Sequence, residues 1–130
     1  METMGQEILI DTDIIIDALR GNQGSQEYLQ SRQFEGIYIS SITAFELLFG
    51  AMKSQRKSMI EKTETFIDRV HIVDFDANVA RCAAEIHTQL AGREIDFRDV
   101  FISATAIANE FSLKTNNTKH FSRVPGLHLA

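Results

Sequence analysis

Residues 7–19 read EILIDTDIIIDAL, and this stretch indicates the fold class. The first four residues form a short apolar run that is typical of a buried strand ending at Asp11. Apolar residues at helical spacing follow over 13–19, and Gly21 closes that helix. A strand that passes almost directly into a helix is the repeating unit of a parallel α/β sheet.

The same alternation continues along the chain. Further strands are predicted over 37–40, 71–74 and 112–115, with a short fifth strand at 126–129. Further helices are predicted from Gly24-Ser25, over 42–52, over 54–69, from an Asp76 cap to Gly92, and over 99–110. Strands and helices in this order imply parallel strands joined by crossovers. We therefore predict a three-layer α/β domain with a four- to five-stranded, mostly parallel sheet flanked by helices.

Length and composition limit the choice of protein class. The 130 residues show no repeat or linker, so we predict one domain over 1–130. Cys82 is the only cysteine, which allows no internal disulfide and suits the cytoplasm. No apolar run is long enough to span a membrane, and the first residues lack a signal-peptide pattern. The net charge of −5 argues against a broad basic face for nucleic acid, but it allows an enzyme whose metal attracts phosphate locally.

Three acidic residues are predicted to meet at one edge of the sheet. Ligands of open parallel sheets bind beyond the carboxyl ends of the strands. Asp11 ends the first strand, and Glu46 lies one turn into the helix that follows the second. Asp99 opens the helix that leads into the last of the four strands, so the loop 91–98 has to carry it to the same edge. Thr115, Asn116 and Asn117 follow that strand.

The surroundings of these acids point to a metal ion. Glu46 interrupts the apolar stretch ITAFELLFGAM, and Asp99 precedes Val100, Phe101 and Ile102. Carboxylates that are partly buried together repel one another, and a divalent cation removes this cost. Hard ions such as Mg²⁺ prefer carboxylate oxygen, and the scattered histidines offer no zinc cluster. Without a phosphate-binding glycine loop, an acidic Mg²⁺ site suggests phosphodiester hydrolysis.

Ordinary structural roles compete with these functional ones. The alternatives are a turn role for Asp11, a helix N-cap for Asp13, a capping box over Thr43-x-x-Glu46, a similar cap over Asp96-x-x-Asp99, and a turn role for Asn117.

Four motifs in order resemble the PIN-domain family, and most closely its VapC-type toxin ribonucleases. They are ILIDTDIII from residue 8, YISSITAFELLFGA from residue 38, IDFRDVFISATAIA from residue 95, and LKTNNTKHFSRVPGL from residue 113. The resemblance covers residues 8–129, nearly the whole chain, and the order of four motifs makes it specific.

The resemblance implies a metal-dependent endoribonuclease. Asp11, Glu46 and Asp99 would hold Mg²⁺ or Mn²⁺, while Asp13 and Thr115 would support them. Asn117 stands at a position that is often aspartate in the family, and its lack of charge argues against a second tightly bound ion. Water would attack the RNA phosphate in line and leave a 5′-phosphate and a 3′-hydroxyl. The family also implies a homodimer and a small cognate antitoxin that covers the site.

Two other classes stay open on the sequence alone. DTDII also resembles the opening motif of haloacid-dehalogenase phosphatases, and a receiver domain could use Asp74 as phosphoacceptor with Lys114 in support. Both of these would be aspartate-based phosphotransfer domains, which is the first class. The second class is a PIN scaffold that binds RNA or protein without catalysis. The candidate basic contacts to RNA are scattered: Arg20, Lys53, Arg56, Lys57 and Arg98.

Overall fold

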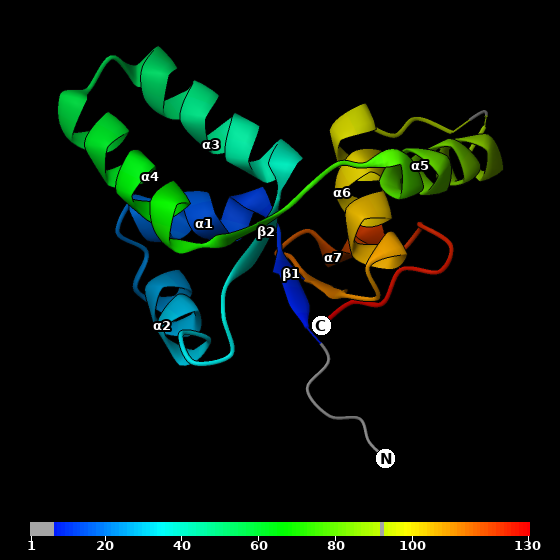
Figure 1. The fold of residues 1–130 in the computed structure, drawn as a ribbon, viewed down its shortest axis with the longest axis horizontal. Coiled ribbons are helices and arrows are strands. Elements are labelled where there is room, and N and C mark those ends of the chain that lie inside the picture. Colours follow the sequence, from blue (N-terminus) through cyan, green and yellow to red (C-terminus); the bar gives the residue numbers. More distant parts are fainter. Residues whose placement is uncertain (1–6, 92) are drawn as a thin grey trace.

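The computed structural model describes residues 7–91 and 93–130. Within these residues the strands form one parallel sheet in the order β3-β2-β1-β4 (Figure 1). The strands are β1 (Ile8–Ile10), β2 (Tyr38–Ser40), β3 (His71–Val73) and β4 (Ser112–Lys114). The predicted α/β class and parallel sheet are therefore confirmed.

Helices cover both sides of this sheet (Figure 1). The helices are α1 (Thr12–Leu19), α2 (Gln23–Ser31), α3 (Ser41–Ser54), α4 (Lys57–Arg69), α5 (Ala77–Gln89), α6 (Phe97–Ala108) and α7 (Thr118–Phe121). Helices α1 to α4 lie on one side of the sheet, and α5 and α6 lie on the other. The result is the predicted three-layer arrangement.

The central strand β1 is buried on both faces, which explains its unbroken apolar run. Leu9 packs with Ile102 of α6 and Leu113 of β4. The next residue, Ile10, belongs to a separate cluster with Ile15 of α1 and Ile39 of β2. Successive side chains of a strand point to opposite faces, so a strand between two helical layers needs an apolar residue at every position.

Some predicted boundaries are wrong, each for a local reason. Residues 126–129 form no strand, because only Leu129 makes an isolated parallel bridge to Leu113. The helix predicted from residue 54 begins at Lys57, since Gln55 adopts a positive φ of 57° and ends α3. The helix predicted from residue 99 begins at Phe97, after an N-cap at Asp96. The short helix α7 was not predicted, and Gly92 lies outside the described residues.

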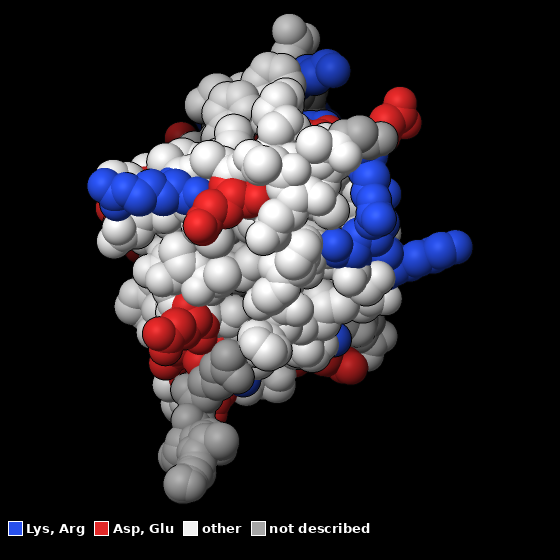
Figure 2. Space-filling view, turned by 90° about the vertical axis from the view of Figure 1, so that its right-hand side faces the viewer, with Lys and Arg blue, Asp and Glu red and all other residues white. Residues whose placement is uncertain are grey.

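The surface carries no broad basic face on the side where α5 and α6 lie. Figure 2 shows that lysine and arginine side chains stand at the margins of this face and that its centre is largely uncharged. This distribution agrees with the acidic composition. Among the described residues, no helix is both long and apolar enough to cross a membrane.

Candidate active site

Asp11 stands where β1 passes into α1, at the carboxyl end of the sheet. Its Oδ1 accepts a hydrogen bond from the Thr12 amide at 2.8 Å, and its Oδ2 accepts one from Thr115 Oγ1 at 2.7 Å. Thr115 follows β4, which pairs with β1. The ends of two neighbouring strands therefore fix this carboxylate, and only 7% of the residue surface is exposed.

Asp11 is also the N-cap of α1, so the N-cap role expected for Asp13 is wrong. Asp13 lies in the first turn of the helix, where its Oδ2 accepts a hydrogen bond from the Asn116 amide at 3.2 Å. Its other oxygen, Oδ1, is buried and has no hydrogen-bond partner among the described residues. Asp13 thus ties the start of α1 to the loop after β4 and leaves one carboxylate oxygen unused.

Glu46 reaches the same edge from α3, the helix that follows β2. Its Oε1 accepts a hydrogen bond from Thr12 Oγ1 at 2.6 Å, and its Oε2 lies 3.2 Å from Arg98 Nη1. The capping box expected over Thr43-x-x-Glu46 is not formed. Ser40 is the N-cap of α3, and its Oγ accepts the Thr43 amide N–H at 3.0 Å. Helix capping therefore does not account for Glu46.

Asp99 lies in the first turn of α6, one turn after the Asp96 cap. Asp96 Oδ1 accepts the Arg98 amide N–H at 2.8 Å, so the expected cap role belongs to Asp96. Asp99 Oδ2 lies 2.7 Å from His120 Nε2, on α7. Asp99 lies near enough to Asp11 for its charge to raise the pKa of that residue, although Asp99 precedes β4 in the chain.

Asn117 is joined to the site through its backbone. Its amide N–H donates to Thr115 Oγ1 at 3.0 Å, next to the bond that Thr115 makes to Asp11. The residue is exposed and occupies the N-cap position of α7, but its side chain makes no capping bond. Its part as a ligand stays a prediction.

The carboxylates of Asp11, Asp13 and Asp99 lie in an environment that disfavours their ionised form. Burial raises the pKa of Asp11 from 3.8 to about 6, against the lowering effect of the Thr115 hydrogen bond. The negative charges of Asp13 and Asp99 raise it further. Burial also raises the pKa of Asp13 and of Asp99, although His120 acts in the opposite direction on Asp99. Acidic groups that raise one another's pKa at a sheet edge are typical of a functional site.

The carboxylate oxygens of these residues are the ligands that a hard divalent cation prefers. Their present positions, however, do not group them around one ion. Within 7–91 and 93–130, no three His, Cys, Asp or Glu side chains are grouped so that they could hold a metal ion. Hydrogen bonds and ion pairs to Thr12, Arg98 and His120 take up carboxylate oxygens instead. The donor set is nevertheless all oxygen, its members repel one another, and Asp13 Oδ1 lacks a partner. Rotation of these side chains around a cation would relieve the repulsion between the carboxylates and give Asp13 Oδ1 a partner.

The hydroxyl groups of this site were largely missed from the sequence. Thr12 Oγ1 bonds Glu46 and lies 2.9 Å from Thr43 Oγ1, which in turn lies 3.2 Å from Ser40 Oγ. Ser40 and Thr43 are fully buried, and Thr12 is nearly so. Buried serine and threonine directly after a strand are unusual, and that signal could have revealed them.

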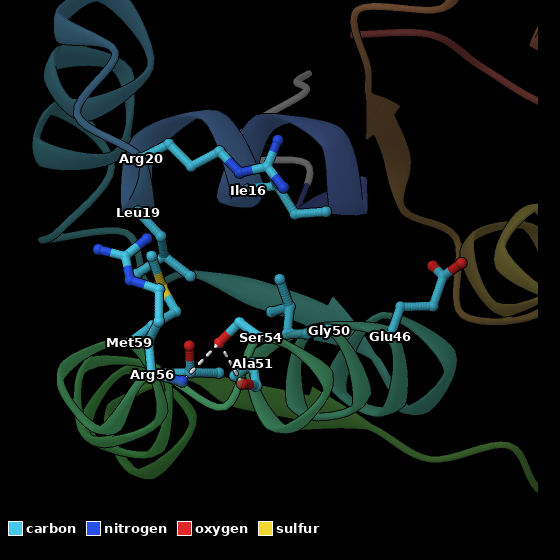
Figure 3. Close-up of a pocket in the computed structure, with 11 residues that line it drawn as sticks. Ile16, Leu19, Arg20, Glu46, Gly50, Ala51, Ser54, Arg56 and Met59 are labelled. Atoms are coloured by element: carbon cyan, nitrogen blue, oxygen red, sulfur yellow. Dashed lines mark hydrogen bonds between the residues drawn. The ribbon is translucent and has the colours of Figure 1, made fainter.

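An apolar groove leads away from the site. Its volume is about 240 Å³, and it lies between α1, α3 and α4. Figure 3 shows Glu46 at one end and Arg20 and Arg56 toward the other, where Leu19 and Met59 also lie. The groove therefore has an acidic end at the site and a basic end away from it.

The sheet order excludes the arrangement of a receiver domain. Asp74 follows β3, whereas Lys114 belongs to β4, and these strands form opposite edges of the sheet. Lys114 Nζ lies instead over the ring of Tyr28, 5.1 Å from its centroid. These two residues could not act together on one phosphoryl group.

Comparison with known proteins identifies the family of this chain. The profile of the PIN domain family matches residues 8–127, so the chain belongs to the PIN-domain family. That assignment agrees with the parallel sheet and the acids at its edge, and it disfavours the haloacid-dehalogenase alternative.

Two similar proteins are a ribonuclease and an endonuclease by name. Ribonuclease VapC2 of Rickettsia felis is 34% identical over 128 residues, which cover 93% of this chain and 94% of that protein. The tRNA(fMet)-specific endonuclease VapC of Shigella flexneri is 32% identical, with 93% and 94% covered. A crystal structure of VapBC2 from Rickettsia felis, bound to a DNA fragment from their promoter, matches with a TM-score of 0.84 and 32% identity. That match covers 95% of this chain and 96% of the other.

Proposed function

We propose that this PIN-domain protein is a metal-dependent endoribonuclease and the toxin of a VapBC-type toxin–antitoxin pair. The single observation that carries the proposal is the approach of three elements at the carboxyl edge of the sheet: Thr12, next to Asp11, donates to Glu46, and the charge of Asp99 raises the pKa of Asp11. The names of the relatives support RNA as the substrate. Cys82, the only cysteine, suits the reducing cytoplasm as its compartment.

Asp11, Glu46 and Asp99 would hold Mg²⁺ or Mn²⁺, with Asp13 and Thr115 in support. The ion would activate water at neutral pH and neutralise charge on the phosphate during hydrolysis. Thr115 and the Thr12 amide keep both Asp11 oxygens in place, and Thr12 Oγ1 orients Glu46. A carboxylate of this cluster that the ion does not occupy would take the proton of the attacking water, and Asp13, whose Oδ1 has no hydrogen-bond partner among the described residues, is the candidate.

Cleavage of RNA by the purified protein tests the proposal. Total RNA is incubated with Mn²⁺ or Mg²⁺ or with EDTA, and the products are separated and sequenced at their ends. We expect discrete metal-dependent products with 5′-phosphate ends that Asp99→Asn abolishes. Asp68→Asn, an exposed acid on α4, is the matched control and should cleave normally. Cyclic 2′,3′-phosphate ends would refute the role of water, and metal binding without cleavage would favour the non-catalytic scaffold.

A homodimer is part of the proposal. Phe45, Phe49 and Met52 lie on one face of α3, and 61%, 55% and 55% of their surfaces are exposed. The rings of Phe45 and Phe49 stack with centroids 5.9 Å apart. An exposed apolar stripe of this kind suits contact with a second copy of the chain. Sedimentation velocity should give a dimer for the natural chain and a monomer for Phe49→Glu, and a dimer in both would place the interface elsewhere.

A cognate antitoxin is the proposed protein partner. The similar solved structure is one of VapBC2, a pair, and the apolar groove offers a place for a partner segment. Gly50 lines the groove in exposed helix, and a Cβ there would meet nothing within 4 Å. Gly50→Arg should therefore fold, block the groove and prevent copurification with the small protein encoded beside this chain. Unchanged copurification would contradict docking in the groove.

A further inference from the structure

The cationic side chain of Arg98 contacts Glu46. Its Nη1 lies 3.2 Å from Glu46 Oε2, so the pair links α6 to α3 across the site. The other edge of the same guanidinium holds Asp96, with Nε 3.1 Å from Oδ1 and Nη2 2.7 Å from Oδ2. The hydrogen bond from Arg98 lowers the pKa of Asp96 to about 2, which agrees with a firm pair.

The two contacts of Arg98 differ in strength. Arg98 makes two hydrogen bonds to Asp96, and both residues lie at the start of α6. It makes one longer hydrogen bond to Glu46, which lies on another helix. Bidentate guanidinium–carboxylate pairs are the stronger kind. The Arg98 side chain is 59% exposed in both pairs, so solvent screens both, and the difference between them lies in the number and length of the bonds. The contact with Glu46 is therefore the one that breaks first.

A metal ion and Arg98 would compete for Glu46. Thr12 occupies Glu46 Oε1 and Arg98 occupies Oε2. A divalent cation on this carboxylate would repel the guanidinium at such a distance. Arg98 would then leave Glu46 but stay beside the site, because Asp96 holds its other edge. Its freed Nη1 would be a donor beside Glu46, and a guanidinium fork suits phosphate oxygens.

Resting on the proposed function, we propose that Arg98 is an exchangeable counter-ion of this site: it neutralises Glu46 in the metal-free protein and binds a phosphate oxygen of RNA once a divalent cation takes Glu46. The chain is acidic overall, so a cation held at the site supplies attraction for RNA that its surface lacks. Arg98 acts as a binding and positioning residue and takes no proton in this scheme.

The first test measures Mn²⁺ binding to the full chain by titration calorimetry without RNA. Arg98→Gln removes the competing cation from Glu46, whose side chain is 19% exposed, and should tighten Mn²⁺ binding roughly two- to fivefold. Arg98→Lys keeps the charge and should bind Mn²⁺ as the natural chain does. Arg81→Gln is the matched control. Arg81 lies on α5, where it contacts Asn78, and its substitution removes the same charge away from the site. It should leave Mn²⁺ affinity unchanged.

The second test measures binding of a short fluorescein-labelled single-stranded RNA by anisotropy. Ca²⁺ serves as the ion, since it takes the same oxygen ligands, and a gel checks that the RNA stays intact. Arg98→Gln should weaken RNA binding roughly three- to tenfold in Ca²⁺, the loss of one charge-assisted phosphate contact. In EDTA the difference should shrink, because Arg98 is then engaged by Glu46.

The opposite effects of Arg98→Gln on Mn²⁺ binding and on RNA binding separate this role from a structural one. A variant that merely folds poorly would lose affinity for both metal and RNA, whereas we expect tighter metal binding and weaker RNA binding. Unchanged or weaker Mn²⁺ binding by Arg98→Gln would overturn the exchange, even in an active nuclease. Failure of the natural chain to bind Mn²⁺ would overturn the proposed function and this inference together.

Discussion

Replacing Asp11 by asparagine should stabilise the metal-free protein at neutral and higher pH. Burial raises the pKa of Asp11 from 3.8 to about 6, and only 7% of the residue is exposed. Between these pH values the folded state binds more protons than the unfolded state, so stability falls as pH rises. A shift of this size corresponds to about 3 kcal/mol of cost for the ionised form above the folded pKa.

Asparagine removes this cost but disturbs one hydrogen bond. Its carbonyl oxygen can still accept the Thr12 amide, whereas its amide group faces the Thr115 hydroxyl that now donates to Oδ2. Losing that bond costs about 1 kcal/mol, so we expect a net gain of about 1–2 kcal/mol at about pH 8. Near pH 4 the charge cost is absent, and Asp11→Asn should be about 1 kcal/mol less stable than the natural chain.

Urea unfolding in EDTA, followed by circular dichroism across this pH range, measures the difference. Asp68→Asn on the exposed face of α4 is the control and should track the natural chain throughout. Added Mn²⁺ should raise the midpoint of the natural chain more than that of Asp11→Asn. A variant that is equally destabilised at both ends of the range would refute the argument, because the buried carboxylate would then carry no ionisation cost.

Six further substitutions, in three matched pairs, test the fold through the same urea measurement. Ile39→Ala removes a fully buried side chain and should cost about 2–5 kcal/mol, whereas Ile72→Ala on the neighbouring edge strand, 40% exposed, should cost less than half as much. Gly36 has a φ of +96°, and a Cβ there would lie 3.2 Å from the Tyr38 ring, so Gly36→Ala should cost more than about 1 kcal/mol. Gly50→Ala lies in open helix and should instead stabilise by roughly 0.5–1 kcal/mol. Asp96→Ala should cost about 1 kcal/mol through loss of the α6 cap, and Asp96→Asn, which can still cap, should cost less.

The site shows why local sequence rules identified some roles and confused others. The sequence predicts Asp76 as a cap and offers Asp96 as an alternative one, and both accept backbone N–H groups of the helices that they precede. A cap needs only residues within one turn, so the sequence carries the whole signal. For Asp11 and Asp13 the same rule placed the cap two residues too late, because either aspartate could supply it and only the end of β1 decides which one does.

The sequence by itself determined the layers of the fold and the acids at its edge. Unbroken apolar strands such as Ile8–Ile10 and helices with apolar faces fix a buried parallel sheet, since no other arrangement covers both faces. The tertiary structure alone decided what those acids touch. The pairs Asp11–Thr115, Thr12–Glu46, Glu46–Arg98 and Asp99–His120 join residues from different elements. Partners so far apart in the chain depend on strand order and helix placement, which hydrophobic periodicity does not encode.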